Sequence, residues 1–254
     1  MTHYLADSAD AWQESWDRQQ EAYLPDREHR IATMLDAVGA VAGGDRPRVL
    51  DLAGGTGTIT LRTLARFPGA EVTVVDQDPV LLALAAASLG DRAQIVSADL
   101  GDPAWAAALP SDGYDAVLTA TALHWLAPER LSTLYTEIRE VLRPGGFLAN
   151  ADHMPDEELP GLTKRLLAAE DSRREIRYAT GAALSWRDWW GRVAADPRLA
   201  PLYAQREKVY PAEHGSAEWT PPASWHLQAL RAAGFTECGL LWRGATDATV
   251  VGVR

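Results

Sequence analysis

The chain has 254 residues, of which 47% are hydrophobic and 23% are charged, a balance that excludes disordered, collagen-like and coiled-coil proteins. Its 24 lysines and arginines against 35 acidic residues give a net charge of −11. A general nucleic-acid binder is disfavoured, because it needs basic side chains to neutralise phosphates. The single cysteine, Cys238, can form neither an internal disulfide nor a cysteine-based metal site, which fits a reducing cytoplasm.

No targeting or membrane segment is expected. The first 21 residues contain acidic side chains and no apolar core, unlike a signal peptide. No apolar run approaches the roughly 18 residues that a membrane span needs. We therefore expect a cytoplasmic protein without membrane contact.

Residues 1–45 are expected to form an N-terminal helical cap. Two helices are predicted within 7–40, and on the first of them Trp12, Trp16 and Tyr23 can share one stripe. Gly43 and Gly44 end this region.

From residue 46 onward, short apolar strands alternate with helices. The predicted strands are 46–53, 70–76, 93–99, 114–120 and 147–153, and the predicted helices are 57–66, 79–89, 102–109 and a segment from Leu131 that Pro144-Gly145-Gly146 ends. This alternation predicts an α/β fold, with a parallel sheet covered by helices on both faces.

The alternation stops between residues 154 and 220, which carry no convincing strand and are expected to form a helical insertion. Ser185 resembles the cap of a helix that carries several tryptophans. A helix at 222–233 and two strands at 237–243 and 248–254 complete a single domain. Only about four residues join these strands, so they must be antiparallel.

The sharpest local signal is the glycine-rich turn in VLDLAGGTGT, residues 49–58. An apolar strand leads through this turn into a helix, whose N-terminus offers free N–H groups to a ligand. A P-loop is excluded, since no lysine is near, and a dinucleotide fingerprint fails because Thr60 stands where its third glycine is required. The turn resembles the first motif of class I S-adenosylmethionine-dependent methyltransferases, with Ala53 in place of the first glycine.

Acidic residues at later strand ends strengthen this resemblance. Asp76 ends the second strand about 20 residues past the glycines, where a carboxylate can accept both ribose hydroxyls. Asp99 ends the third strand and can accept from an adenine amino group, while Leu100 packs on the ring. Together with Asp115 and the LRPGGFL segment, the pattern resembles the small-molecule branch of the family over about 46–153 and 221–254. The resemblance implies a seven-stranded sheet of order 3-2-1-4-5-7-6 with the last strand antiparallel.

The same resemblance implies S-adenosylmethionine as the cofactor. Asp51 is expected to hold the turn through backbone hydrogen bonds, and Arg30 is either near the cofactor carboxylate or on a solvated helix face. The expected cofactor-binding residues are Arg30, Asp51, Ala53, Gly54, Gly55, Thr56, Gly57, Asp76, Gln77, Asp99, Leu100 and Thr119.

Methyl transfer is an in-line displacement, for which a protein chiefly supplies proximity and orientation. Where the acceptor must lose a proton, His124 after the fourth strand and His153 after the fifth are the candidate bases, and His214 in the insertion is a weaker one. His124 has a second interpretation, in which it simply orders its loop. No metal site is expected, because the remaining histidines are scattered.

The chain has ten tryptophans, and they are the best indication of the acceptor site. Aromatic side chains in the N-terminal helices and the insertion can form a lid over an apolar acceptor, or can be ordinary core residues. We expect one or more of the tryptophans at 186, 189 and 190 to face the pocket, and the N-terminal helix to close it from the opposite side. The candidate acceptor-contacting residues are Trp12, Trp16, Tyr23, Trp125, Trp186, Trp189 and Trp190.

These patterns predict a methyltransferase acting on a small-molecule acceptor, as a monomer or homodimer, with no nucleic-acid partner. Oxygen is the favoured acceptor atom on family frequency alone. One alternative is a protein that binds the cofactor for non-methylating chemistry, such as a cyclase. Another is a macromolecule methyltransferase, although TATALHWL (119–126) replaces the DNA-methylating motif after the fourth strand.

Overall fold

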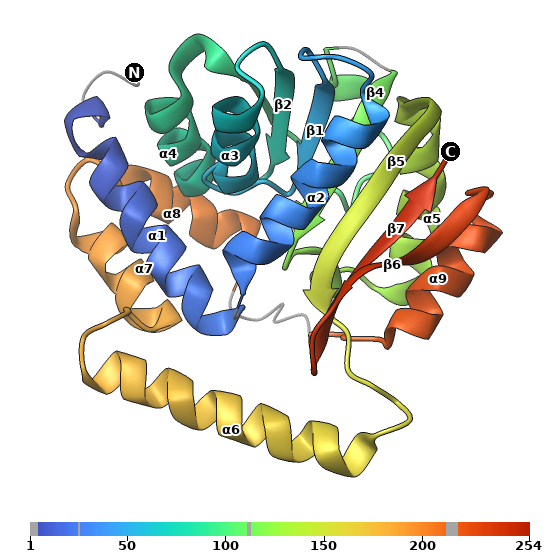
Figure 1. Ribbon diagram of the computed structural model, residues 1–254. Coiled ribbons are helices and arrows are strands. Elements are labelled where there is room, and N and C mark those ends of the chain that lie inside the picture. The colour runs from blue at the N-terminus through green and yellow to red at the C-terminus, as the bar shows by residue number, and fades with distance from the viewer. Residues whose placement is uncertain (1–4, 25, 111–112, 212–217) are drawn as a thin grey trace.

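A computed structural model describes residues 5–24, 26–110, 113–211 and 218–254. At its centre is a seven-stranded sheet with the order β3-β2-β1-β4-β5-β7-β6, as expected (Figure 1). The first five strands run parallel, and β7 lies antiparallel between β5 and β6. The strands are β1 (Arg48–Leu52), β2 (Glu71–Asp76), β3 (Gln94–Ser97), β4 (Tyr114–Ala120), β5 (Leu142–His153), β6 (Glu237–Arg243) and β7 (Asp247–Val253).

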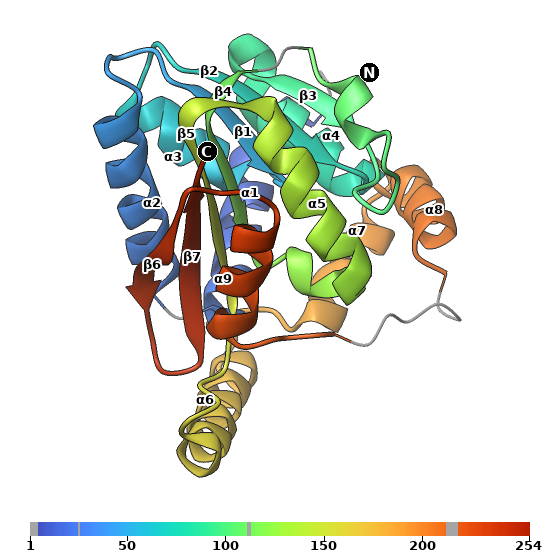
Figure 2. The same ribbon diagram turned by 90° about the vertical axis from the view of Figure 1, so that its right-hand side faces the viewer.

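Helices cover both faces of the sheet (Figures 1 and 2). One face carries α2 (Arg27–Val41), α3 (Thr58–Arg66) and α4 (Pro79–Leu89), and the other carries α5 (Pro128–Val141) and α9 (Ala223–Ala232). Short 3₁₀ turns lie at Ala6–Ser8, Gly90–Arg92, Trp105–Ala108 and Leu123–Trp125. Apolar side chains from both sides of the strands fill two cores, which is why the strands read as continuous apolar runs.

Local capping explains where two of the helices begin. The Asp78 side chain accepts from the backbone N–H groups of Val80 and Leu81 at the start of α4, and proline occupies the first turn. Ser185 caps α7 (Trp186–Ala195) by accepting from the N–H of Asp188.

Two boundaries differ from the sequence prediction. The segment 102–109 forms only a 3₁₀ turn, and β5 begins at Leu142, before Pro144-Gly145-Gly146 rather than after it. The register between β4 and β5 shifts at this point, so these residues continue the strand through an irregularity. A Cβ on Gly146 would lie 2.8 Å from the Tyr114 carbonyl oxygen, so the close strand approach requires glycine.

The insertion is helical in its described part, with α6 (Pro160–Ala179), α7 and α8 (Ala200–Val209) and no strand. The sequence did not predict α8. Helix α6 stands apart from the body (Figures 1 and 2), and Thr163 is its only buried residue. Among the described residues, no helix is long and apolar enough to cross a membrane.

The N-terminal helix α1 (Ala9–Tyr23) packs against α7 and α4 in a single apolar cluster. Trp12 and Trp16 both contact Trp189, with ring centroids 5.7 and 4.8 Å apart. The expectation that α1 and the insertion close the pocket from opposite sides is therefore wrong. They form one joint aromatic layer, because each buries its tryptophans against the other.

Candidate functional site

A cavity of about 720 Å³ lies at the carboxyl ends of the parallel strands. This is where ligands bind in open α/β sheets. Its walls come from the glycine-rich turn, from the ends of β2 to β5, and from α1, α2, α7 and α8. It is large enough for one or two small molecules.

The glycine-rich turn forms the floor of one half of this cavity. Ala53, Gly55 and Gly57 have positive φ angles of 52°, 56° and 80°, so the chain makes a tight left-handed turn. A Cβ on Gly54 would lie 2.7 Å from the Asp51 Cγ atom, so this position admits only glycine without a shift of its neighbours. Ala53 is the non-glycine residue that tolerates the left-handed conformation here.

Asp51 ties the turn to the helix that follows it. Its Oδ2 accepts from the Thr60 backbone N–H at 3.0 Å and from the Thr60 hydroxyl at 2.7 Å. Its Oδ1 is buried without a hydrogen-bond partner, although Asp51 lines the cavity. Burial raises the pKa of this carboxyl to about 6, although the hydrogen bonds from Thr60 act to lower it. A ligand hydroxyl or amine is one way to satisfy such an oxygen.

Asp76 stands opposite the turn, at the end of β2. It accepts from the backbone N–H groups of Gly55 and Asp78, both at 2.9 Å, and so fixes the turn against the neighbouring strand. Burial raises its pKa to about 6. Each carboxylate oxygen has a second lone-pair site, so Asp76 can still accept from a ligand. Gln77 lines the cavity beside it.

The third strand contributes Asp99 and Leu100 to the same half. Asp99 accepts from the Gly101 N–H at 2.7 Å, and both side chains line the cavity. The Leu100 carbonyl accepts from the Arg130 side chain at 2.7 Å, which holds the loop in place.

The other half of the cavity contains two histidine–aspartate pairs. The Nδ1 atom of His124 lies 2.7 Å from Oδ1 of Asp152, and Nδ1 of His153 lies 2.6 Å from Oδ1 of Asp247. Both histidines line the cavity, and their ring centroids are 5.8 Å apart. An ionised carboxylate can only accept, so each pairing places a proton on Nδ1 and leaves Nε2 for the cavity.

The two aspartates were not predicted from the sequence. Asp152 is 28 residues from His124, and Asp247 is 94 residues from His153, so only the folded sheet brings them together. A signal for Asp152 was nevertheless present. Asn150 and Asp152 place polar side chains at alternate positions of an otherwise apolar strand, which puts both on one buried face.

Aromatic side chains close the cavity from α1, α7, α8 and the β4–α5 loop. The aromatic side chains in its lining are Trp16, Tyr23, Trp125, Trp186, Trp190 and Tyr210. Trp186 is 40% exposed and Trp125 47% exposed, so both have free surface for a ligand. Trp12 and Trp189 do not line the cavity. They are buried in the cluster between α1 and α7, as core residues.

Residues 49–146 match the family model of the methyltransferase domain. A trans-aconitate 2-methyltransferase of an Azoarcus species is 32% identical over 190 residues, which cover 75% of this chain and 64% of that protein. An uncharacterized methyltransferase of Mycobacterium tuberculosis is 38% identical over 112 residues, or 44% of this chain and 42% of the relative. These alignments span less than two thirds of the relatives' own length.

Solved structures have the same fold. A putative O-methyltransferase from Nostoc punctiforme superposes with a TM-score of 0.58 at 15% identity, covering 93% of this chain and 60% of the other. Human N-acetylserotonin methyltransferase, solved in complex with SAM, gives 0.54 at 17% identity, covering 96% and 57%. The family match falls on the glycine-rich turn and the strands that carry the cavity. Residues 49–146 are thus similar to the methyltransferase domain family, and the sheet has the fold of these solved methyltransferases.

Within the methyltransferase fold, Arg30 is not where the sequence placed it. Its side chain is 2% exposed, pairs with Asp247 at 3.2 Å and stacks on Trp242, and it does not line the cavity. Arg27, one helical turn earlier on α2, lines the cavity instead. Arg27 pairs with Asp17 of α1 at 3.0 Å. The prediction of Arg30 rested on the resemblance, which places a basic group on this helix without distinguishing between its arginines.

Three other predicted residues of the methyltransferase domain lie outside the cavity lining. Thr56 and Gly57 sit on the far side of the turn, where Gly57 packs against Leu89 of α4. Thr119 is a fully buried residue inside β4. His214 lies outside the described residues.

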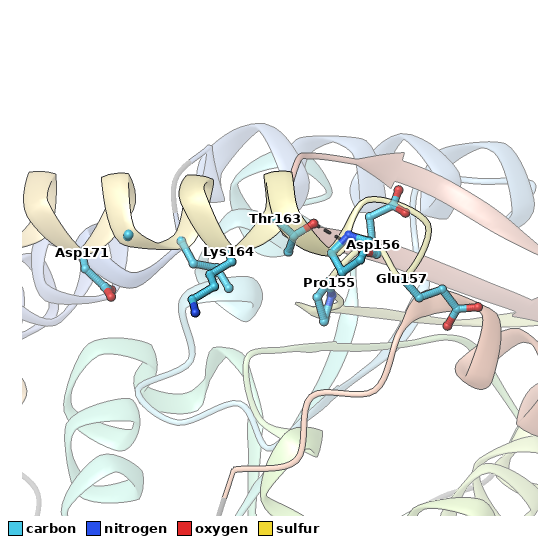
Figure 3. Close-up of a pocket in the computed structure, with 9 residues that line it drawn as sticks. Pro155, Asp156, Glu157, Thr163, Lys164 and Asp171 are labelled. Carbon is cyan, nitrogen blue, oxygen red and sulfur yellow. Dashed lines mark hydrogen bonds between the residues drawn. The ribbon is translucent and has the colours of Figure 1, made fainter.

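A second hollow of about 530 Å³ runs along α6 and shares no lining residue with the cavity at the strand ends (Figure 3). Lys164 and Asp171 point from the helix on the same side, and the Thr163 hydroxyl donates to the Asp156 carbonyl. None of the predicted site residues lines it. The described residues contain no group of three side chains that could hold a metal ion.

Proposed function

We propose that this chain transfers the methyl group of S-adenosylmethionine to an oxygen atom of a small-molecule acceptor. The observation that carries the proposal is the single cavity that joins a glycine-rich, carboxylate-lined half to a half with two buried histidine–aspartate pairs. The Azoarcus relative is named for a methylation of trans-aconitate, and the Nostoc structure for O-methylation, so a small acceptor and an oxygen atom both have support.

The glycine-rich half has the features that the cofactor requires. Asp76 is placed to accept from ribose hydroxyls, and the unpartnered Asp51 Oδ1 leaves one more acceptor beside the turn. Asp99 and Leu100 offer a polar acceptor and an apolar surface for the adenine ring. Arg27 carries the positive charge that suits the carboxylate of the methionine part. When bound, S-adenosylmethionine supplies an electrophilic methyl group, whose C–S bond breaks as a C–O bond forms and whose sulfur keeps the electron pair.

His124 serves as the general base in this proposal. Asp152 fixes the ring by its hydrogen bond to Nδ1, which leaves Nε2 free to take the proton from an acceptor hydroxyl. The 3₁₀ turn Leu123–Trp125 and the bond from the Trp219 N–H to the His124 carbonyl at 3.0 Å hold the backbone at this position. Aromatic side chains shield the site from water and leave the reacting groups in a fixed orientation.

A titration tests the cofactor part of the proposal. S-adenosylmethionine and S-adenosylhomocysteine should bind the full chain at micromolar levels in calorimetry, while NAD and ATP should not compete. Asp76→Asn should weaken binding by about 10- to 100-fold, because charge-assisted hydrogen bonds contribute about 1.5–3 kcal/mol. Asp102→Asn is the control, since Asp102 is exposed near the same edge and does not line the cavity. Absence of binding by either nucleoside would refute the proposal.

A second assay separates methyl transfer from the non-methylating alternative. With tritiated S-adenosylmethionine and a panel of small hydroxylated acceptors, label should pass into an organic product and S-adenosylhomocysteine should accumulate in equal amount. Tight cofactor binding with product formed but no label transferred would instead support a non-methylating enzyme.

A further inference from the structure

The cavity is divided by charge along the sheet. Carboxylates line the half beneath β1, β2 and β3, and histidines line the half beneath β4 and β5. The carboxylate residues are Asp51, Asp76, Asp78 and Asp99, and the histidines are His124 and His153. Three residues depart from this division. Arg27 of α2 pairs with Asp17 at 3.0 Å and acts on the charge of Asp51, Arg206 of α8 pairs with Asp78 at 2.7 Å, and Glu218 is exposed at the rim.

His153 is held from behind by a buried chain of charges. Asp247 accepts at Oδ1 from His153, and its Oδ2 accepts from the Thr246 hydroxyl at 2.8 Å and pairs with Arg30 at 3.2 Å. Both oxygens of the carboxylate are therefore engaged, so the imidazole cannot swing without breaking this chain. Arg30 is 2% exposed and faces no bulk solvent. The arrangement fixes one edge of the ring and presents the other edge to the cavity.

The surrounding charges favour the doubly protonated ring. Burial lowers the pKa of His153, but the hydrogen bond and charge of Asp247, together with the charge of Asp152, outweigh it, and the pKa is raised above 6.5. Arg30 opposes them, and Glu170 of α6 lies close by, within 3.3 Å of the Thr246 hydroxyl. A doubly protonated ring has no lone pair to accept a proton and instead donates from Nε2. His153 is thus suited to hold an anionic oxygen, whereas a base needs an unprotonated Nε2.

The neighbouring surface suits a planar, apolar molecule. The Trp125 ring lies beside His124, with centroids 5.0 Å apart, and it is 47% exposed. Leu126 and Tyr23 also line the cavity. A flat aromatic body can pack on these side chains while its oxygen atoms reach the two histidines, whose ring centroids are 5.8 Å apart.

We propose that the acceptor is an aromatic hydroxy acid, whose hydroxyl is methylated at His124 and whose neighbouring carboxylate is held by His153. This inference rests on the proposed function and adds the substrate class. Arg27 pairs with Asp17 and is assigned to the carboxylate of the cofactor, so among the described lining residues of this half His153 is the imidazolium donor that matches the single charge of an acceptor carboxylate. In the transfer, the hydroxyl proton passes to His124, while the carboxylate on His153 keeps its charge throughout.

The test uses the full chain saturated with S-adenosylhomocysteine and a matched pair of probes, 2-hydroxybenzoate and 2-hydroxybenzamide. The two have the same shape and differ in charge. In calorimetry the carboxylate should bind about tenfold or more tightly than the amide. His153→Gln should abolish this preference by weakening the carboxylate alone, whereas His124→Gln should retain it. Two-bond ¹H–¹⁵N spectra of the imidazoles should show His153 doubly protonated to a higher pH when 2-hydroxybenzoate is bound.

Several results would overturn the proposal. They are equal affinity for the two probes in the wild-type protein, no measurable binding of either, or a carboxylate preference that persists in His153→Gln. Thermal melting and S-adenosylhomocysteine affinity report whether each variant is folded. The comparison of the two probes on the wild-type protein does not depend on any variant. Failure of S-adenosylhomocysteine to bind the wild-type chain refutes the proposed function itself and is measured first, so the two failures are distinguishable.

Discussion

Two buried carboxyl groups in the glycine-rich half predict a dependence on pH that separates cofactor affinity from stability. The pKa of Asp76 is raised by burial from 3.8 to about 6. Ribose hydroxyls donate more strongly to the ionised carboxylate, in charge-assisted hydrogen bonds, than to the neutral acid, which has less acceptor capacity, so binding should favour loss of the proton. Between pH 7 and pH 5 the ionised fraction falls to about one tenth, and the affinity for S-adenosylhomocysteine should fall about tenfold.

The free energy of unfolding should change with pH in the opposite direction to the cofactor affinity. A carboxyl whose pKa is higher in the folded state than in the unfolded state binds more protons when folded, so the free energy of unfolding falls as pH rises from about 4 through about 6. The rise of about two pKa units corresponds to about 3 kcal/mol for Asp76. Asp76→Asn removes this cost above pH 6 but loses one of the two backbone bonds, worth about 1 kcal/mol. The variant without ligand should therefore be stabilised by roughly 2 kcal/mol at pH 7.5.

Urea unfolding and calorimetric titration at pH 5, 6, 7 and 7.5 measure both quantities on the wild-type chain and on Asp76→Asn. Any change in affinity that comes from titration of the ligand itself affects both proteins equally, so it cancels in the ratio of the wild-type affinity to the variant affinity at each pH. The variant should bind weakly and with a smaller dependence on pH than the wild-type chain, because Asp51 is then the remaining carboxyl of the pair that titrates near pH 6. It should also be more stable near neutrality. A wild-type affinity that is constant from pH 5 to pH 7.5, or a variant destabilised at pH 7.5, would contradict the assignment of Asp76 as a buried ribose ligand.

Three further substitutions test the turn, the aromatic layer and the base. Ala53→Gly should raise the free energy of unfolding by up to about 1 kcal/mol in urea titrations, because Ala53 is held at φ 52°; a loss of stability would show that this conformation is not strained. Trp189→Ala should cost about 3–5 kcal/mol, since its side chain is fully buried, whereas Trp186→Ala, 40% exposed, should shift the melting temperature only slightly; similar shifts would contradict the assigned packing. Once an acceptor is known, Asp152→Asn should lower kcat about 10²–10⁴-fold at unchanged cofactor affinity, because His124 loses the partner that fixes its ring; a loss below tenfold would favour catalysis by proximity alone.

The sheet could be predicted because its signals are local. Each parallel strand contains a short apolar run, which in β2 is rich in β-branched residues, and helix caps such as Asp78 mark the elements between the strands. Helix α8 was missed for the opposite reason. It has no buried residue, and its apolar and charged side chains do not segregate onto faces, so its sequence carries little periodic signal.

The site was only half predictable, for a related physical reason. The residues that line the glycine-rich half lie at strand ends, and sequence position alone specifies that edge of the sheet. The partners of the histidines do not follow from position. Asp247 meets His153 only because β7 runs antiparallel beside β5 and pairs these two residues directly, a register set by the whole sheet.

The pairing of β5 with β7 also explains why Arg30 does not line the cavity, because it places Asp247 beside both Arg30 and His153. An arginine on the helix before the glycine-rich turn suggests a contact with an anionic ligand. The fold instead gives Arg30 an internal anion, Asp247, whose other oxygen holds His153. A buried arginine pairs more readily with a carboxylate than it stays unpaired, because the desolvation cost of a lone charge is several kcal/mol. Arg30 therefore does not contact the cavity. It acts on it indirectly, by holding Asp247, which in turn fixes the His153 ring. Arg27, three residues earlier, also pairs with a carboxylate, that of Asp17, but it lines the cavity and can therefore contact the ligand that the sequence had assigned to Arg30.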